Sequence, residues 1–140
     1  MSHVAKYETT IGKNGCVNEA LLKKAIEFAA KELEGEVSGT FDSRHQGKNL
    51  PSFEGKPLLA SIRTKDMKEG MGVILTKDKK IQFVHDLDGN RSAFQKAQAS
   101  VERNYKTLAL AVALQKINYK TEVVSANGLT VITGTDTTLV

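Results

Sequence analysis

Residues 71–85 read MGVILTKDKKIQFVH, in which two apolar runs enclose a charged tetrapeptide at residues 77–80. Short apolar runs that end in charged or turn-forming residues are typical of buried strands. The stretch therefore predicts a β-hairpin with a charged tip. Residues 58–64 have the same character and predict a further strand just before it.

Upstream of this hairpin, apolar residues recur at helical spacing. Leu22, Ile26 and Leu33 lie on one face, which Ala25 and Ala29 extend. Asn18 is a good N-cap, Glu19 suits the positive first turn, and Gly35 stands where helices commonly end. The pattern predicts a first helix between Asn18 and Gly35.

A second, longer helix is predicted from Ser92, as its cap, to about residue 118. Phe94, Val101 and Leu108 fall on one face of it. Its second half, residues 108–114, is apolar all round, a pattern typical of a helix that is enclosed on more than one side. Either the rest of the chain or another subunit is expected to enclose it.

The remaining strands are shorter or more local. Residues 4–11 alternate between apolar and polar side chains, and residues 37–41 are consistent with a short strand. Residues 119–125 and 128–133 flank an Asn-Gly pair, which is a strong hairpin signal. The order β-α-β-β-β-β-α-β-β is rich in hairpins. It predicts an α+β fold of one domain over residues 1–140, with a mainly antiparallel sheet and two helices packed on one face.

Between the first helix and the hairpin, residues 42–57 contain two prolines, two glycines and few apolar side chains. We expect a long surface loop there, and loops of this length are commonly functional or mobile. The periodic elements also predict the core. Its expected members are Leu22, Ile26, Leu33, Phe83, Phe94, Val101, Leu108, Val112, Val123 and Val131.

Composition narrows the class of protein. The chain has 140 residues and a formal net charge of +4, which is mild for its size. Its single cysteine, Cys16, cannot form an intramolecular disulfide or a cysteine-rich zinc site. The N-terminal residues contain no hydrophobic signal core, and no apolar run approaches the roughly 20 residues that cross a bilayer. We expect a soluble cytoplasmic protein without a cofactor.

Two groups of residues are candidates for a ligand-binding site. His85, Asp86 and Asp88 combine an imidazole with carboxylates, which suits proton transfer or cation binding, whereas the simpler interpretation is a strand end followed by a turn. Arg44 and His45 in the expected loop have the chemistry to hold an anion. Neither group forms a recognised metal-binding or catalytic motif, so no metal ligand and no catalytic residue is predicted.

A third candidate surface is basic. Lys96, Arg103 and Lys106 fall on the side of the second helix opposite its apolar face. Such a strip suits phosphates or an acidic protein surface, although a solvated helix face is commoner. Nucleic-acid binding is not favoured, because aromatic side chains for base stacking are scarce.

Several short motifs resemble a known family. They are the Met1-Ser2-His3 start, the hairpin at residues 72–84 with Asp86 after it, the long helix containing Tyr105, and the closing strands around residues 127–129. Together they resemble a family of small plastid and cyanobacterial proteins of unknown function. The resemblance implies a compact α+β fold and no particular reaction.

The absence of a catalytic motif favours a non-enzymatic protein that works by binding itself, another protein or a small anionic ligand. The alternative is an enzyme that uses His85, Asp86 and the loop at residues 42–57, and a third hypothesis is weak nucleic-acid binding by the basic strip. If the protein is a homodimer, the contact is expected on the second helix, at Leu110, Leu114 and Ile117.

Overall fold

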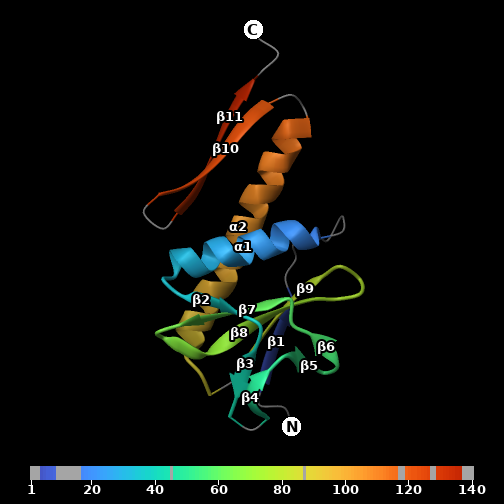
Figure 1. Ribbon diagram of the computed structural model, residues 1–140, viewed down its shortest axis with the longest axis vertical. Helices are drawn as coiled ribbons and strands as arrows, with labels where there is room; N and C mark the ends of the chain where they lie inside the picture. Colours follow the sequence, from blue (N-terminus) through green and yellow to red (C-terminus); the bar gives the residue numbers. More distant parts are fainter. Residues whose placement is uncertain are drawn as a thin grey trace.

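The computed structural model describes residues 4–8, 17–44, 46–86, 88–116, 119–126 and 129–136. Its central sheet has five antiparallel strands in the order β1-β9-β8-β7-β2 (Figure 1). In chain order these strands are β1 (Val4–Glu8), β2 (Glu36–Ser38), β7 (Ala60–Thr64), β8 (Met67–Leu75) and β9 (Ile81–Asp86). The predicted α+β class is confirmed.

The hairpin predicted at residues 71–85 is confirmed and lies in the middle of the sheet as β8 and β9. Gly72 stands opposite Val84 and Leu75 opposite Ile81. At the tip, the Thr76 amide donates to the Lys80 carbonyl oxygen at 2.9 Å. Every residue of β9 is buried, as expected for a strand with a neighbour on both edges and a layer on both faces.

Helix α1 (Glu19–Glu32) begins as its sequence predicts. The Asn18 side chain accepts a hydrogen bond from the Leu21 amide at 3.1 Å. The helix ends just before Gly35, where an added Cβ would lie 2.5 Å from the Arg63 carbonyl oxygen. Only glycine therefore allows the chain to pass this close to β7 as it leaves the helix.

Helix α2 (Arg91–Lys116) begins two residues earlier than expected, so the prediction of Ser92 as its cap was wrong. The cap is Asn90, whose side chain accepts from the Ala93 amide at 3.1 Å. Its backbone carbonyl accepts from the Phe94 amide, also at 3.1 Å. Asparagine and serine are both strong caps, and two candidates two residues apart cannot be separated by type alone.

The main core lies between the two helices and one face of the sheet. Leu22, Ile26, Phe83, Phe94, Val101 and Leu108 are buried in it as predicted. Leu33 and Val112 are only half-buried, so their prediction as core residues holds in part. The side chains of Val123 and Val131 lie outside the part of the chain that the structure describes.

The expectation of a long surface loop at residues 42–57 was wrong. The segment folds into two small hairpins, β3 (Phe41–Ser43) with β4 (Gly47–Leu50), and β5 (Ser52–Phe53) with β6 (Lys56–Pro57). In the described part of the chain, eight strands rather than four thus separate the two helices. Strands of two to four residues are too short to show the alternation on which sequence prediction relies.

These hairpins cover the second face of the sheet. Phe41 and Phe53 are buried with their rings edge to face, 6.5 Å apart between centroids. They pack with Val4, Ile74 and Val84 in a second apolar cluster. Because successive residues of a strand point to opposite faces, the neighbours of Ile74 and Val84 in the sequence face the helices instead. The sheet is the middle of three layers.

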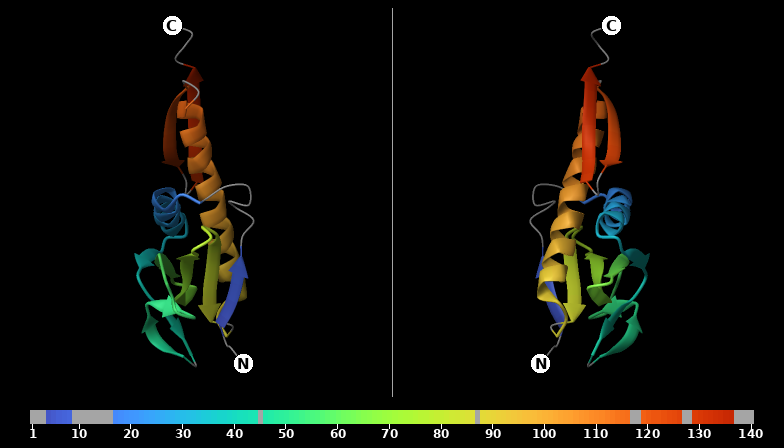
Figure 2. Two further views of the ribbon diagram at one scale, coloured as in Figure 1. Left: turned by 90° about the vertical axis from the view of Figure 1, so that its right-hand side faces the viewer. Right: turned by 90° about the vertical axis from the view of Figure 1, so that its left-hand side faces the viewer.

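The last two strands stand apart from the central sheet. β10 (Tyr119–Ala126) and β11 (Leu129–Asp136) form the predicted hairpin, but they pair with each other and not with β1 or β2. Both views in Figure 2 show this hairpin running alongside the second half of α2, away from the sheet. The predicted Asn-Gly turn between the strands lies outside the described residues.

No helix among the described residues is long and apolar enough to cross a membrane.

Candidate functional site

His85 and Asp86 are neighbours on β9, and they serve opposite faces of the sheet. His85 points to the helices, where its ring stacks on Phe94 with the centroids 3.8 Å apart and the planes 13° from parallel. Its Nδ1 lies 3.1 Å from the Asp86 carbonyl oxygen. The predicted cluster of His85 with Asp86 and Asp88 is therefore divided by the sheet itself.

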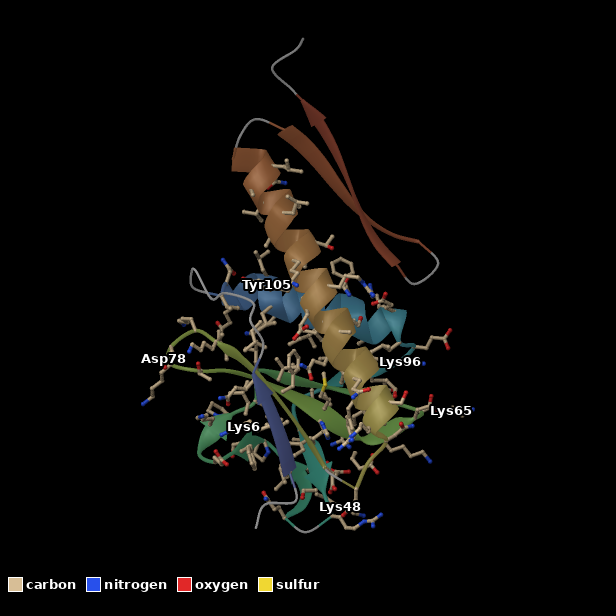
Figure 3. The ribbon with its side chains drawn as sticks, turned by 180° about the vertical axis from the view of Figure 1, so that it is seen from behind. Lys6, Lys48, Lys65, Asp78, Lys96 and Tyr105 are labelled. Carbon is tan, nitrogen blue, oxygen red and sulfur yellow. The ribbon has the colours of Figure 1, made fainter. Side chains whose placement is uncertain are left out.

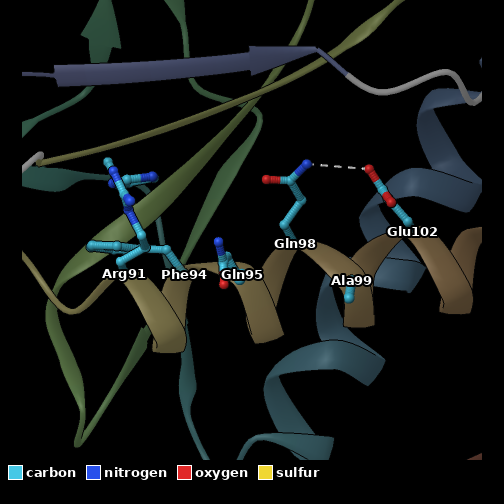
Figure 4. Close-up of a pocket in the computed structure, with 7 residues that line it drawn as sticks. Arg91, Phe94, Gln95, Gln98, Ala99 and Glu102 are labelled. Atoms are coloured by element: carbon cyan, nitrogen blue, oxygen red, sulfur yellow. Dashed lines mark hydrogen bonds between the residues drawn. The ribbon is translucent and has the colours of Figure 1, made fainter.

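A cavity of about 280 Å³ lies beside His85, along the first half of α2 (Figure 4). Its other lining residues are Arg91, Phe94, Gln95, Gln98, Ala99 and Glu102. Gln98 donates from Nε2 to Glu102 at 3.4 Å, so two of the polar groups are engaged with each other.

Burial of the imidazole lowers the pKa of His85 below its usual value of 6.5. The unfolded chain then binds more protons than the folded chain at every pH between the two pKa values. Stability from this group is therefore complete above about pH 6.5, falls as the pH drops below that value, and levels off below the folded pKa.

We expect urea unfolding to show a lower free energy of unfolding at pH 5.5 than at pH 7.5, and this difference to shrink in His85→Gln. The same measurement on Lys96→Gln, an exposed position on α2, serves as the control and should keep the full difference. An equal pH dependence in wild type and His85→Gln would contradict the assignment to His85.

On the opposite face, the buried Asp86 carboxylate holds two loops together. Its Oδ1 accepts from the Asp88 amide at 2.8 Å, and its Oδ2 accepts from the Arg44 amide. The Asp86 carbonyl oxygen accepts from the Gly89 amide at 3.1 Å. The carboxylate thus organises the turn after β9 and fastens it to the turn of the β3–β4 hairpin. This is the turn-forming role that the simpler interpretation of the sequence gave to it.

A charged pocket of about 310 Å³ lies where these loops meet. It is lined by Asp42, Ser43, Arg44, Gly47, Lys48, Glu69, Asp86 and Asp88. The structure therefore brings together three of the predicted site residues, Arg44, Asp86 and Asp88. His85 lies on the other side of the sheet, and His45 is outside the described residues.

Sequence analysis missed Lys48 and Glu69 in this pocket. Glu69 precedes Gly70, whose φ of 83° and the register shift between β7 and β8 mark a bulge in the strand. Gly70 directly precedes the strand predicted from residue 71, and a glycine beside strand residues is a signal for such a bulge, which often redirects side chains toward sites. No comparable signal in the sequence indicates Lys48.

Arg63 fixes the position of Asp42, one of the residues that line the pocket. Its guanidinium donates to both oxygens of Asp42, at 3.1 and 3.2 Å, and to the carbonyl oxygens of Thr40 at 3.1 Å and Lys68 at 2.8 Å. The hydrogen bonds from Arg63 lower the pKa of Asp42 more than burial raises it. The Asp42 carboxylate is therefore ionised, and its negative charge is compensated by Arg63. The same arginine anchors the β3–β4 hairpin to β7 and β8.

The basic strip on α2 is exposed as predicted, but one of its members is paired. Lys96, Arg103 and Lys106 all face solvent. The Arg103 guanidinium forms an ion pair with Glu32 of α1. Glu32 also accepts from the buried Asn104 side chain at 3.2 Å, so this carboxylate is part of the contact between the helices. The strip thus presents less free positive charge than its sequence indicates.

The described residues contain no group of three or more histidine, cysteine, aspartate or glutamate side chains arranged to hold a metal ion. Cys16 and His3 lie outside those residues. Comparison with protein-family models, curated proteins and solved structures found no match to this chain. A function for the protein therefore has to be inferred from its own geometry.

Proposed function

We propose that the protein is a cytoplasmic, non-enzymatic module that acts by binding, and that the outward face of α2 binds a second copy of the chain. The separation of Arg44 from His85 supports binding over catalysis, because an enzyme built on the predicted residues needs both in one cleft. The single cysteine in 140 residues supports a reducing compartment.

The outward face of α2 carries the exposed apolar surface that supports this proposal. Leu110 is 54% exposed and is, with Val37, one of the two large apolar side chains that are exposed among the described residues. Ala113 is exposed one turn later, and Leu114 is half-buried beside it. The helix has 26 residues, or roughly 39 Å at 1.5 Å per residue. Its second half extends beyond the sheet, with the β10–β11 hairpin alongside (Figure 1).

The distribution of charge along α2 favours a second copy as the occupant. Lys96 and Arg103 stand in the first half of the helix, Lys106 stands one turn before Leu110, and Leu110 and Leu114 stand in the second half. A two-fold axis near Leu110, with the helices antiparallel, brings the apolar halves together, leaves Lys96 and Arg103 at the rim and places Lys106 beside the contact. Rim charges weaken association little, and a symmetric dimer is the commonest oligomer. Ile117, the third predicted contact, lies outside the described residues.

Sedimentation equilibrium at micromolar concentration tests this proposal. The expected mass is near twice the 15.3 kDa of one chain. Leu110→Glu should weaken the dimer at least about tenfold, because it places a charge at the centre of the contact, while the circular dichroism spectrum stays unchanged. Gln95→Glu adds the same charge to an exposed position in the first half of α2 and should remain dimeric. A wild-type monomer under these conditions would refute the proposal.

A further inference from the structure

The charged pocket draws its cations and its carboxylates from different elements. Arg44 and Lys48 belong to the β3–β4 hairpin. Glu69 belongs to β8, and Asp88 to the turn between β9 and α2. The pocket therefore combines two positive groups from one small hairpin with two negative groups from the body of the fold.

The charged ends of three of these groups are not engaged in a hydrogen bond or an ion pair within the described residues, although the charge of Lys48 helps to lower the pKa of Asp42. Among the described residues, the ion pairs join Lys6 to Glu54, Arg63 to Asp42 and Arg103 to Glu32. Within the same part of the chain, no hydrogen bond or ion pair engages the Arg44 guanidinium, the Lys48 ammonium or the Glu69 carboxylate. Arg44 and Lys48 are exposed and Glu69 is half-buried, so all three remain accessible to a ligand.

Two carboxylates of the pocket, Asp42 and Asp86, are already satisfied. Asp42 is bound on both oxygens by Arg63. Asp86 accepts backbone hydrogen bonds from Arg44 and Asp88. These two residues therefore fix the walls of the pocket, and recognition is left to Arg44, Lys48 and Glu69.

This balance of charge selects a class of ligand. A simple anion that approaches Arg44 and Lys48 also meets Glu69, and a simple cation that approaches Glu69 meets the two basic groups. A molecule that carries both charges complements the pocket without a like-charge contact. The pocket thus favours a zwitterion over the small anion that Arg44 and His45 indicate in the sequence.

We propose that this pocket binds a small zwitterion with one carboxylate and one ammonium group. The carboxylate contacts Arg44 and Lys48, and the ammonium contacts Glu69. The volume of about 310 Å³ lies at the lower end of the range for small-molecule sites. The site is independent of the proposed dimer, because Lys48 lies at the hairpin end of the molecule, far from the second half of α2 (Figure 3).

A ladder of zwitterions tests the proposal by NMR titration. Glycine, β-alanine, γ-aminobutyrate and 5-aminopentanoate carry the same two charges at increasing separation. At least one of them should shift the backbone amide signals of Gly47 and Lys48 saturably. Butyrate and butylamine, which each carry one of the charges, should bind at least tenfold more weakly than that member. The proposal is overturned if no member of the ladder binds, or if either one-charge compound binds as tightly.

Two variants test the assigned contacts with the ladder member that binds best. Lys48→Gln and Glu69→Gln each remove one charge from an accessible side chain and should raise the dissociation constant at least tenfold. Lys23→Gln removes a charge from an exposed position on α1, outside the pocket, and should leave it unchanged. Wild-type affinity in both pocket variants would overturn the assignment even if a zwitterion binds to the protein.

Discussion

Replacing Phe94 with alanine is expected to lower the free energy of unfolding by about 3–5 kcal/mol. Phe94 is 2% exposed and lies in the main core, where its ring stacks on His85. The backbone also fits the ring closely, since an added Cβ on Gly89 would lie 2.5 Å from Phe94 Cε2. Neighbours this tightly placed cannot collapse into the space that the ring leaves, so a cavity remains.

Urea unfolding followed by circular dichroism measures this loss. Gln95→Ala is the matched control, because Gln95 is the next residue of α2 and is exposed. Its effect should stay within about 0.5 kcal/mol. A loss below about 1 kcal/mol in Phe94→Ala would mean that the first turn of α2 does not pack on the sheet as described.

Replacing Arg63 with alanine should cost about 2–3 kcal/mol, as several charge-assisted hydrogen bonds are lost together. The pair with Asp42 is partly exposed, at 22% and 28% of the two side chains, so the loss is smaller than for a fully buried ion pair. The variant leaves Asp42 and the Thr40 carbonyl oxygen without these donors. The β3–β4 hairpin should loosen, and cleavage by trypsin after Arg44 or Lys48 should become faster.

The pH dependence of the stability lost in Arg63→Ala distinguishes the loss of the ion pair from a loss of packing. Because the folded pKa of Asp42 lies below its usual value of 3.8, the pair stabilises the protein above pH 3.8 and ceases to do so as the pH falls through the folded pKa. The deficit of Arg63→Ala should therefore shrink in acid, whereas Lys65→Ala, an exposed neighbour, should behave like wild type throughout. A deficit that is equal at pH 3 and pH 7 would contradict the role of the ion pair.

Elements with long periodic patterns were predictable from the sequence. The spacing of Leu22 and Ile26 located α1, and the two apolar runs around residues 77–80 located the central hairpin. The rule that successive strand residues face opposite ways also explains why His85 and Asp86 lie on different faces of the sheet. All of these inferences use residues close together in the chain, where geometry is fixed by the local backbone.

The layer formed by β3 to β6 was not predictable in this way. Its burial depends on Phe41 and Phe53, two isolated aromatic residues in a polar segment, and on their meeting a sheet face made by distant strands. The pairing of the charged side chains was not predictable from the sequence either. Nothing local indicates that Glu32 neutralises Arg103, or that Arg63 binds Asp42, because each pair is brought together only by the packed fold.

The position of β1 also bears on how the chain folds. β1 pairs with β9 over a long separation in the chain, from Val4 opposite Asp86 to Glu8 opposite Gln82, whereas β8 and β9 are joined by a tight turn. Closing a loop of roughly 80 residues carries a much larger entropy cost than closing a hairpin. β1 is therefore expected to dock late, after the hairpin has formed. Until it does, the open edge of β9 is a template for strands of other molecules, so crowded folding conditions favour aggregation through that edge.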